Sequence, residues 1–256
     1  RHVPQDPSYI HASWINKTSQ QPYIMTQLPL KQTQGDFWRM VWEEDVRLIV
    51  SLMDLEAEAP DELYLPLAKD AKMEIAGPGH LLWHLEDSTD PASLSPHPDF
   101  RLRSLFLTKK GPGVAPNFSH KIVHLSYLKW PAAELSTPPD SLLDRRMRAG
   151  TVNGMFGMGG AGGYEAPILV HCWNGARRSG TAVALAVAVE VLTQKKQVAL
   201  GAIVADVRLR RHGSLQSPAH YVFLHRRLLQ EALQLKLLAA SDPHIPALLK
   251  AFAANQ

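Results

Sequence analysis

Apolar residues along the chain fall into short segments whose spacing predicts both strands and helices. Residues 47–53 and 166–171 are compact apolar runs, which are typical of strands buried on both faces of a sheet. Residues 101–108 and 121–129 alternate between apolar and polar, which predicts antiparallel strands with one solvated face. Strands come first and helices last, so the pattern favours an α/β or α+β sheet flanked by helices.

Four segments carry the spacing of helices. Residues 36–44 repeat large apolar side chains every three or four positions, as one face of a helix does. Residues 181–192 are apolar nearly all round, which predicts a helix at the centre of the molecule. Residues 198–210 and 219–238 have one apolar face each, so we expect amphipathic helices that cover the sheet.

Three stretches separate these elements and indicate loops. Residues 87–99 are rich in Asp, Ser and Pro, and residues 110–116 form a smaller turn of Gly and Pro. Residues 150–163 contain seven of the sixteen glycines, which predicts a flexible insert rather than a core element. We therefore expect a single domain over residues 1–240 that carries this insert, followed by a C-terminal tail over residues 241–256.

Composition excludes several classes of protein. The 256 residues are 45% hydrophobic and 20% charged, which is ordinary for a globular chain and unlike a disordered or collagen-like one. One cysteine cannot build a disulfide framework or a cysteine-rich zinc site, and the scattered histidines show no metal-ligand spacing. The net charge of +3 does not by itself indicate nucleic acid, and no apolar run is long enough to span a membrane. We expect neither metal nor cofactor, and a reducing, cytoplasmic location.

The chemistry is concentrated in residues 168–180, which read ILVHCWNGARRSG. A buried strand leads into Cys172, a loop follows, and an apolar helix begins near Arg178. This arrangement gathers backbone N–H groups and the positive end of a helix around an anion, and it favours the nucleophilic thiolate of the cysteine. Arg178 supplies a planar fork for phosphate oxygens, and Ser179 can donate its hydroxyl to the sulfur. A lone cysteine is more often an inert apolar side chain, but the whole pattern favours a phosphate-binding loop.

This segment resembles the signature His-Cys-Ser-x-Gly-x-Gly-Arg-Thr-Gly of the protein tyrosine phosphatase family. Residues 8–15 (SYIHASWI), 23–42 (YIMTQLPLKQTQGDFWRMVW) and 64–66 (YLP) are similar to further blocks of that family, in the family's order. The resemblance covers about residues 8–235. It implies a twisted mixed sheet flanked by helices.

The resemblance also assigns roles to residues of the site. It implies that Cys172 attacks phosphorus, that Arg178 and loop N–H groups hold the phosphate oxygens, and that Ser179 assists the thiolate. Gln216 falls where the family positions the water that hydrolyses the cysteinyl-phosphate intermediate. The phosphate loop itself would comprise His171, Trp173, Asn174, Gly175, Ala176 and Arg177 between the nucleophile's strand and Arg178. His171 is expected to be structural.

Four departures from the family pattern bear on activity. In the acid loop, Trp130 and Pro131 are followed by Ala132, where the family has the Asp that protonates the leaving tyrosine oxygen. Loss of a general acid typically lowers a rate roughly 10²–10⁴-fold, and Glu134 can substitute only if the loop backbone shifts. Arg177 replaces a family Gly.

The other two departures lie in the phosphate loop and near the start of the chain. Trp173 replaces a family Ser, a bulk that is tolerable if it packs against a neighbouring loop. The family's phosphotyrosine-recognition segment would precede Ser8, and we do not find it.

These features leave several functions open. The first is a protein tyrosine phosphatase that hydrolyses phosphotyrosine in proteins with weakened activity. The second is a pseudophosphatase that binds phosphorylated partners or acts as a scaffold. A phosphoinositide phosphatase or a sulfurtransferase is a third reading, which the block Asp-Phe-Trp-Arg-Met at residues 36–40 disfavours.

Within the family, the spacing and the last two helices most resemble the phosphatase domain that follows a Bro1 domain in the His-domain endosomal-sorting phosphatases. Because the chain begins at Arg1 rather than at a methionine, we expect preceding domains that bind sorting or signalling proteins, and an association with endosomes.

Overall fold

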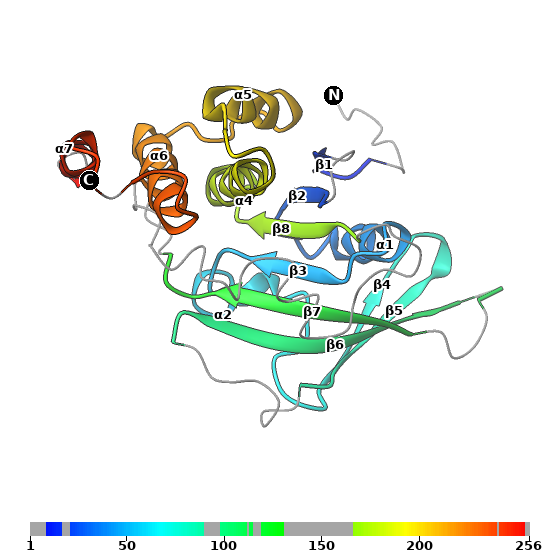
Figure 1. Cartoon of the computed structure of the whole chain (residues 1–256). Coiled ribbons are helices and arrows are strands. Elements are labelled where there is room, and N and C mark those ends of the chain that lie inside the picture. The colour runs from blue at the N-terminus through cyan, green and yellow to red at the C-terminus, as the bar shows by residue number, and fades with distance from the viewer. Residues whose placement is uncertain are drawn as a thin grey trace.

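The computed structural model describes residues 9–16, 21–89, 98–111, 113–114, 119–130, 166–239 and 241–253. The expected insert at 150–163 lies outside these residues, as do Pro131, Ala132 and Glu134 of the acid loop. Within the described part, eight strands form one sheet in the order β1-β2-β8-β3-β7-β6-β5-β4 (Figure 1). The strands are β1 Ala12–Ile15, β2 Tyr23–Gln27, β3 Leu48–Ser51, β4 Lys72–Ala76, β5 Leu82–Asp87, β6 Phe100–Lys110, β7 Ser119–Tyr127 and β8 Ile168–Cys172.

The sheet is mixed, and its parallel part is central. Strands β2, β8, β3 and β7 run parallel to one another, and the outer pairs are antiparallel. Strand β8 has parallel partners on both sides and every residue of it is buried, as expected for a continuous apolar run. The long strand β6 alternates between buried and accessible positions, because it has one face toward solvent. The strands predicted over 47–53, 101–108, 121–129 and 166–171 are confirmed.

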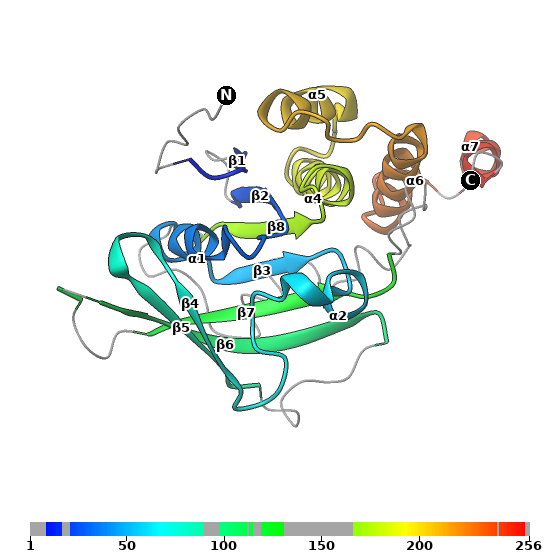
Figure 2. The same cartoon turned by 180° about the vertical axis from the view of Figure 1, so that it is seen from behind.

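Helices cover both faces of the sheet. They are α1 Gln34–Glu43, α2 Leu55–Glu58, α4 Arg177–Lys195, α5 Leu200–Arg210, α6 Pro218–Gln234 and α7 His244–Ala253, with short 3₁₀ turns at Pro60–Glu62 and Pro78–His80. Helices α4, α5 and α6 lie above the sheet in Figure 1, and α1 and α2 lie on the opposite face, toward the viewer in Figure 2. All four predicted helices are present, although α6 ends at Gln234 and not at 238.

Each face of the sheet has its own apolar core. The core under α4 contains Val183, Leu185 and Ala188 of that helix against strand residues such as Val170. Helix α4 is therefore the central helix that its apolar sequence predicts. The core on the other face contains Phe37 and Trp38 of α1, whose rings pack edge to face. These two cores fix β8 from both sides, so the loop that leaves its carboxyl end starts from a rigid position.

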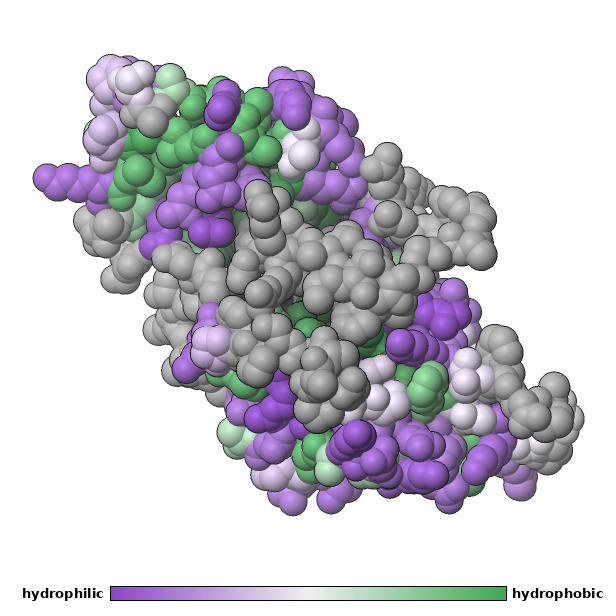
Figure 3. Space-filling model, turned by 60° about the horizontal axis from the view of Figure 1, so that its bottom comes forward, coloured by the Kyte–Doolittle hydropathy of each residue, from purple (hydrophilic) through white to green (hydrophobic). Residues whose placement is uncertain are grey.

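The range 241–256, which the sequence assigns to a tail, contains helix α7. Ile245 is buried, and the ring of Phe252 stacks on His225 of α6 with 6.4 Å between centroids. Figure 3 shows that apolar side chains on that face of the molecule gather toward the helical end, while the end built from β-hairpins is mainly hydrophilic. Among the described helices, none combines the length and apolarity that a membrane crossing requires.

Candidate active site

The phosphate loop, residues 171–178, leaves the carboxyl end of β8 and enters α4. Backbone bonds hold the end of the strand on both sides: Leu52 N–H donates to His171 O at 2.9 Å, and Leu28 N–H donates to Cys172 O at 2.9 Å. The Cys172 side chain is only 1% exposed. A loop between a central parallel strand and a helix N-terminus is a favourable place for an anion, because N–H groups and the helix dipole point toward it.

Gly175 lets the loop turn tightly. Its φ of +64° lies in the left-handed region, and a Cβ at this position would stand 2.2 Å from the backbone of Thr26. Arg177, which replaces a family Gly, does not have a positive φ and is the first residue of α4. The substitution at Arg177 therefore introduces no left-handed strain.

The side chain of Asn174 turns back onto its own loop, although the residue as a whole is exposed to solvent. Its Oδ1 accepts the N–H of Ala176 at 3.0 Å and the N–H of Arg177 at 3.2 Å. The Sγ of Cys172 donates to the same oxygen at 3.5 Å. One carboxamide oxygen thus holds two N–H groups of the loop and the sulfur of the expected nucleophile.

Arg178 is held by a bidentate ion pair. Its two Nη atoms donate to the carboxylate oxygens of Glu58 at 3.1 and 2.8 Å, and Nη1 also donates to Trp130 O at 3.0 Å. The side chains are 10% and 16% exposed, so the pair is largely shielded from water. Such fork-to-fork geometry fixes the orientation of the guanidinium as well as its charge. Trp130, the first residue of the expected acid loop, is buried, and its backbone O contacts the guanidinium of Arg178 directly.

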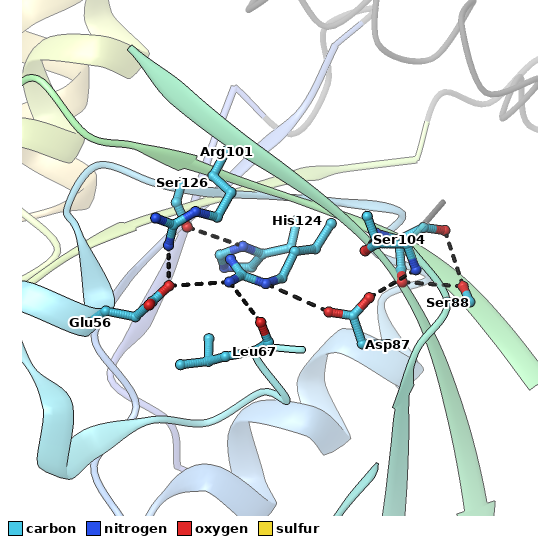
Figure 4. A network of polar contacts seen from close by, with 10 residues as sticks. Glu56, Leu67, Asp87, Ser88, Arg101, Ser104, His124 and Ser126 are labelled. Carbon is cyan, nitrogen blue, oxygen red and sulfur yellow. Dashed lines mark hydrogen bonds and ion pairs between the residues drawn. The ribbon is translucent and has the colours of Figure 1, made fainter. Parts of the chain in front are cut away.

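Helix α2, which carries Glu58, is anchored by a second set of charges (Figure 4). Glu56, two residues earlier, is bound by Arg101 and by Arg103 of β6, the latter at 3.2 Å. Arg103 also donates to Leu67 O and pairs with the buried Asp87 at 3.6 Å. The four-residue helix therefore links the guanidinium of the phosphate loop to a buried ion pair on the outer strands.

A chain of buried hydrogen bonds lies behind the nucleophile. The hydroxyl of Tyr64 bonds His171 Nε2 at 2.6 Å and His124 Nε2 at 2.8 Å. Burial, and then the charge of Arg178, lowers the pKa of His171 to about 3. Burial is also the main reason why the pKa of His124 lies well below its usual value. Both imidazoles are consequently neutral at physiological pH, which agrees with the structural role expected for His171.

Arg211 braces the phosphate loop from outside. It is buried, and it donates to Gly175 O at 3.1 Å, Asn174 O at 3.2 Å and His11 O at 3.2 Å. Burial lowers the pKa of its guanidinium, and the nearby Cys172 partly offsets this effect. Arg211 is thus part of the structure of the loop and not a solvated surface charge.

Three further predicted residues, and His220, occupy different positions. The Trp173 side chain is 55% exposed, so it stands largely in solvent and not against a neighbouring loop. Ser179 is buried, and its Oγ has no hydrogen-bond partner among the described residues. Gln216 is exposed in the loop between α5 and α6, where its amide nitrogen lies beside Gly213. His220 bonds Thr181 Oγ1 at 3.0 Å and meets the ring of Trp130.

Sequence reasoning missed Glu58, His124 and Arg211 as parts of the site. A histidine at an inward position of an otherwise apolar strand is a visible hint for His124. Glu58 and Arg211 look like ordinary surface charges in the sequence, because only the fold brings them to the phosphate loop. Within the described residues, no group of three metal-ligating side chains occurs.

Comparison with known proteins identifies the class to which this fold and this loop belong. The chain belongs to the protein-tyrosine phosphatase family, whose family model matches residues 1–230. The resemblance inferred from the sequence motifs is thereby confirmed.

Individual relatives support the same assignment. The chain is 30% identical to tyrosine-protein phosphatase non-receptor type 7 of Mus musculus over 234 residues, covering 90% of this chain and 58% of the relative. It is 29% identical to tyrosine-protein phosphatase 3 of Dictyostelium discoideum, covering 93% of this chain and 23% of the relative. It is 32% identical to receptor-type tyrosine-protein phosphatase V of Rattus norvegicus, covering 91% and 13%. The chain thus spans less than two thirds of each of these relatives.

Proposed function

We propose that this chain hydrolyses phosphotyrosine in proteins through a cysteinyl-phosphate intermediate, at a rate weakened by Ala132. The observation that carries the proposal is the juxtaposition of a buried Cys172 at the end of β8 with Arg178, whose guanidinium is fixed by Glu58. A positioned nucleophile and a preoriented cation that holds phosphate oxygens are the main requirements of phosphoryl transfer.

The proposed reaction has two steps, and neither step needs a metal ion. The Cys172 thiolate attacks phosphorus, the bond from phosphorus to the tyrosine oxygen breaks, and that oxygen takes the electron pair. In the family an Asp protonates this oxygen; here the proton comes from water or from Glu134. Water, positioned by Gln216, then attacks the cysteinyl phosphate, and the sulfur leaves as a thiolate with inorganic phosphate as product. Arg178 stabilises the charge on the transferred group in both steps.

The alternative is a pseudophosphatase that binds phosphorylated partners or acts as a scaffold. The substitution at Ala132 supports it, because a site can retain its phosphate-binding groups when the acid step is lost. The resemblance to Bro1-domain phosphatases extends either proposal to preceding domains that bind sorting or signalling proteins and to an endosomal location.

The test compares hydrolysis of 4-nitrophenyl phosphate and of a phosphotyrosine peptide by the chain and by its Cys172→Ser variant. A good leaving group needs little protonation, so we expect Cys172-dependent hydrolysis of the nitrophenyl ester and much slower hydrolysis of the peptide. Ala132→Asp should accelerate the peptide reaction, by roughly 10²–10⁴-fold at most, and leave the ester nearly unchanged.

Two results separate the candidates. Absence of Cys172-dependent hydrolysis of the ester would refute the enzymatic proposal. If the inactive chain still binds the phosphotyrosine peptide in calorimetry, and Arg178→Met abolishes that binding, the pseudophosphatase is the correct function.

A further inference from the structure

The N–H groups of the phosphate loop already bond an acceptor, which belongs to the exposed residue Asn174. Oδ1 of Asn174 takes the N–H groups of Ala176 and Arg177 and the Sγ–H of Cys172. These are groups that the proposed reaction directs at a phosphate: the N–H groups would hold its oxygens and the sulfur would attack its phosphorus. The carboxamide oxygen therefore occupies the place of a phosphate oxygen.

One hydrogen-bond donor next to the loop has no acceptor within the described part of the chain in this arrangement. Ser179 is buried in the first turn of α4, and its hydroxyl has no partner among the described residues. A buried hydroxyl without a partner costs free energy, and this one remains able to donate to a further acceptor. Arg178 donates through its Nη atoms to Glu58 and Trp130, which keeps its guanidinium in place whether or not an anion is present.

We propose that Asn174 is an internal competitor for the phosphate site, whose side chain must rotate out of the loop before a phosphate can bind. This inference deepens the proposed function and rests on it for the identity of the ligand. A phosphate oxygen carries charge and accepts hydrogen bonds more strongly than a neutral carboxamide, so phosphate displaces the Asn174 side chain. Because the bonds to Asn174 must first be broken, the net affinity of the loop for phosphate is lower than it would be without them. The rotation concerns one side chain, and Arg211 holds the backbone O of Asn174 throughout.

The competing explanation is that Asn174 only braces the loop. A side chain that accepts the N–H groups two and three residues later also resembles a helix cap, and caps stabilise. The two explanations predict opposite effects of substitution. A competitor, once removed, frees the N–H groups for phosphate, whereas a brace, once removed, leaves the loop disordered and its phosphate affinity lower.

The experiment measures binding of inorganic phosphate by calorimetry to the chain and to Asn174→Ala and Asn174→Asp. We expect Asn174→Ala to bind phosphate about tenfold more tightly, since two neutral hydrogen bonds no longer have to be broken. Asn174→Asp should bind at least tenfold more weakly, because a carboxylate holds the N–H groups more firmly and repels the anion. Thr33→Ala is the matched control: Thr33 Oγ1 also accepts a backbone N–H, from Leu30, at an exposed turn, and its loss should not change phosphate affinity.

Kinetics on 4-nitrophenyl phosphate provide the second measurement. Because Asn174 is displaced in both the bound state and the transition state, Asn174→Ala should lower KM about tenfold and change kcat less than twofold. The reverse order of affinities, with Asp equal to Asn and Ala weakest, would show a brace and overturn the inference, as would equal affinities in all three. If Asn174→Ala does not fold, Asn174→Asp decides: phosphate affinity equal to or above that of the parent chain overturns the inference.

Failure of the two proposals can be told apart. Hydrolysis that depends on Cys172, together with phosphate affinities that ignore residue 174, refutes the inference and leaves the enzyme intact. Tighter phosphate binding by Asn174→Ala without hydrolysis in any variant refutes the enzymatic function and leaves the inference standing for a binding module.

Discussion

The hydroxyl of Tyr64 links two histidines in the interior of the protein. It is fully buried and joins two fully buried imidazoles, His124 and His171, through bonds of 2.8 and 2.6 Å. Burial raises the pKa of Tyr64 well above its usual value, so the group is a neutral hydroxyl at every working pH. Tyr64→Phe removes only this oxygen and keeps the ring that packs edge to face on Phe37.

The magnitude follows from the groups left behind. In Tyr64→Phe the Nε2 atoms of His124 and His171 lose their partner in a place that water does not reach. An unsatisfied buried polar group costs about 1–3 kcal/mol, so the variant should lose about 2–6 kcal/mol of unfolding free energy. That is a large part of the 5–15 kcal/mol that typical domains possess.

The assay is urea unfolding followed by fluorescence, in which a loss of this size moves the midpoint by about 1–2 M. The matched variant is His124→Leu, which removes one of the two orphaned groups. The double variant Tyr64→Phe/His124→Leu should cost less than the two single costs added, by about 1–3 kcal/mol, because one unsatisfied nitrogen is gone. A cost for Tyr64→Phe below about 0.5 kcal/mol would refute the argument.

Three further predictions concern other parts of the site. His124 and His171 are neutral in the folded protein, because burial lowers their pKa, and they bind protons when the protein unfolds. The unfolding free energy should therefore fall as the pH drops below about 6.5, by up to about 1.4 kcal/mol per pH unit for each histidine, and for His171 this fall should continue to about pH 3. Urea midpoints that are equal at about pH 7.5 and about pH 5.5 would contradict this prediction. Gly175→Ala should abolish Cys172-dependent hydrolysis, because its Cβ would stand 2.2 Å from Thr26; an active variant would mean that the loop adapts. Arg211→Met should lower the unfolding free energy, measured with urea, by about 1–3 kcal/mol, because the carbonyl oxygens of Gly175 and Asn174 lose their hydrogen-bond donor. The matched variant Arg210→Met, at an exposed position, should lower it far less.

Much of the architecture was predictable from the sequence, because it depends on local patterns. The central strand β8 and the helix α4 are both apolar runs, and an apolar run must be buried. The segments of β6 and β7 alternate, and alternation fixes which face of a strand meets the core. The first pair of strands, the β4–β5 hairpin and helix α7 were not predicted from spacing. These strands are only four to six residues long, and so short a run does not distinguish a strand from a loop by spacing alone.

The sequence by itself indicated Cys172 and Arg178 as the expected nucleophile and its cation, since both are placed by one continuous strand–loop–helix segment whose geometry is local. Only the tertiary structure decided what surrounds them. Glu58 reaches Arg178 across 120 positions of sequence, and Arg211 reaches the loop from the end of α5. The hydrogen bonds from the loop N–H groups of Ala176 and Arg177 to Asn174 Oδ1 are likewise a property of the folded backbone. Such contacts cannot be inferred from the spacing of residues along the chain, because only the folding of the whole chain brings these distant partners together.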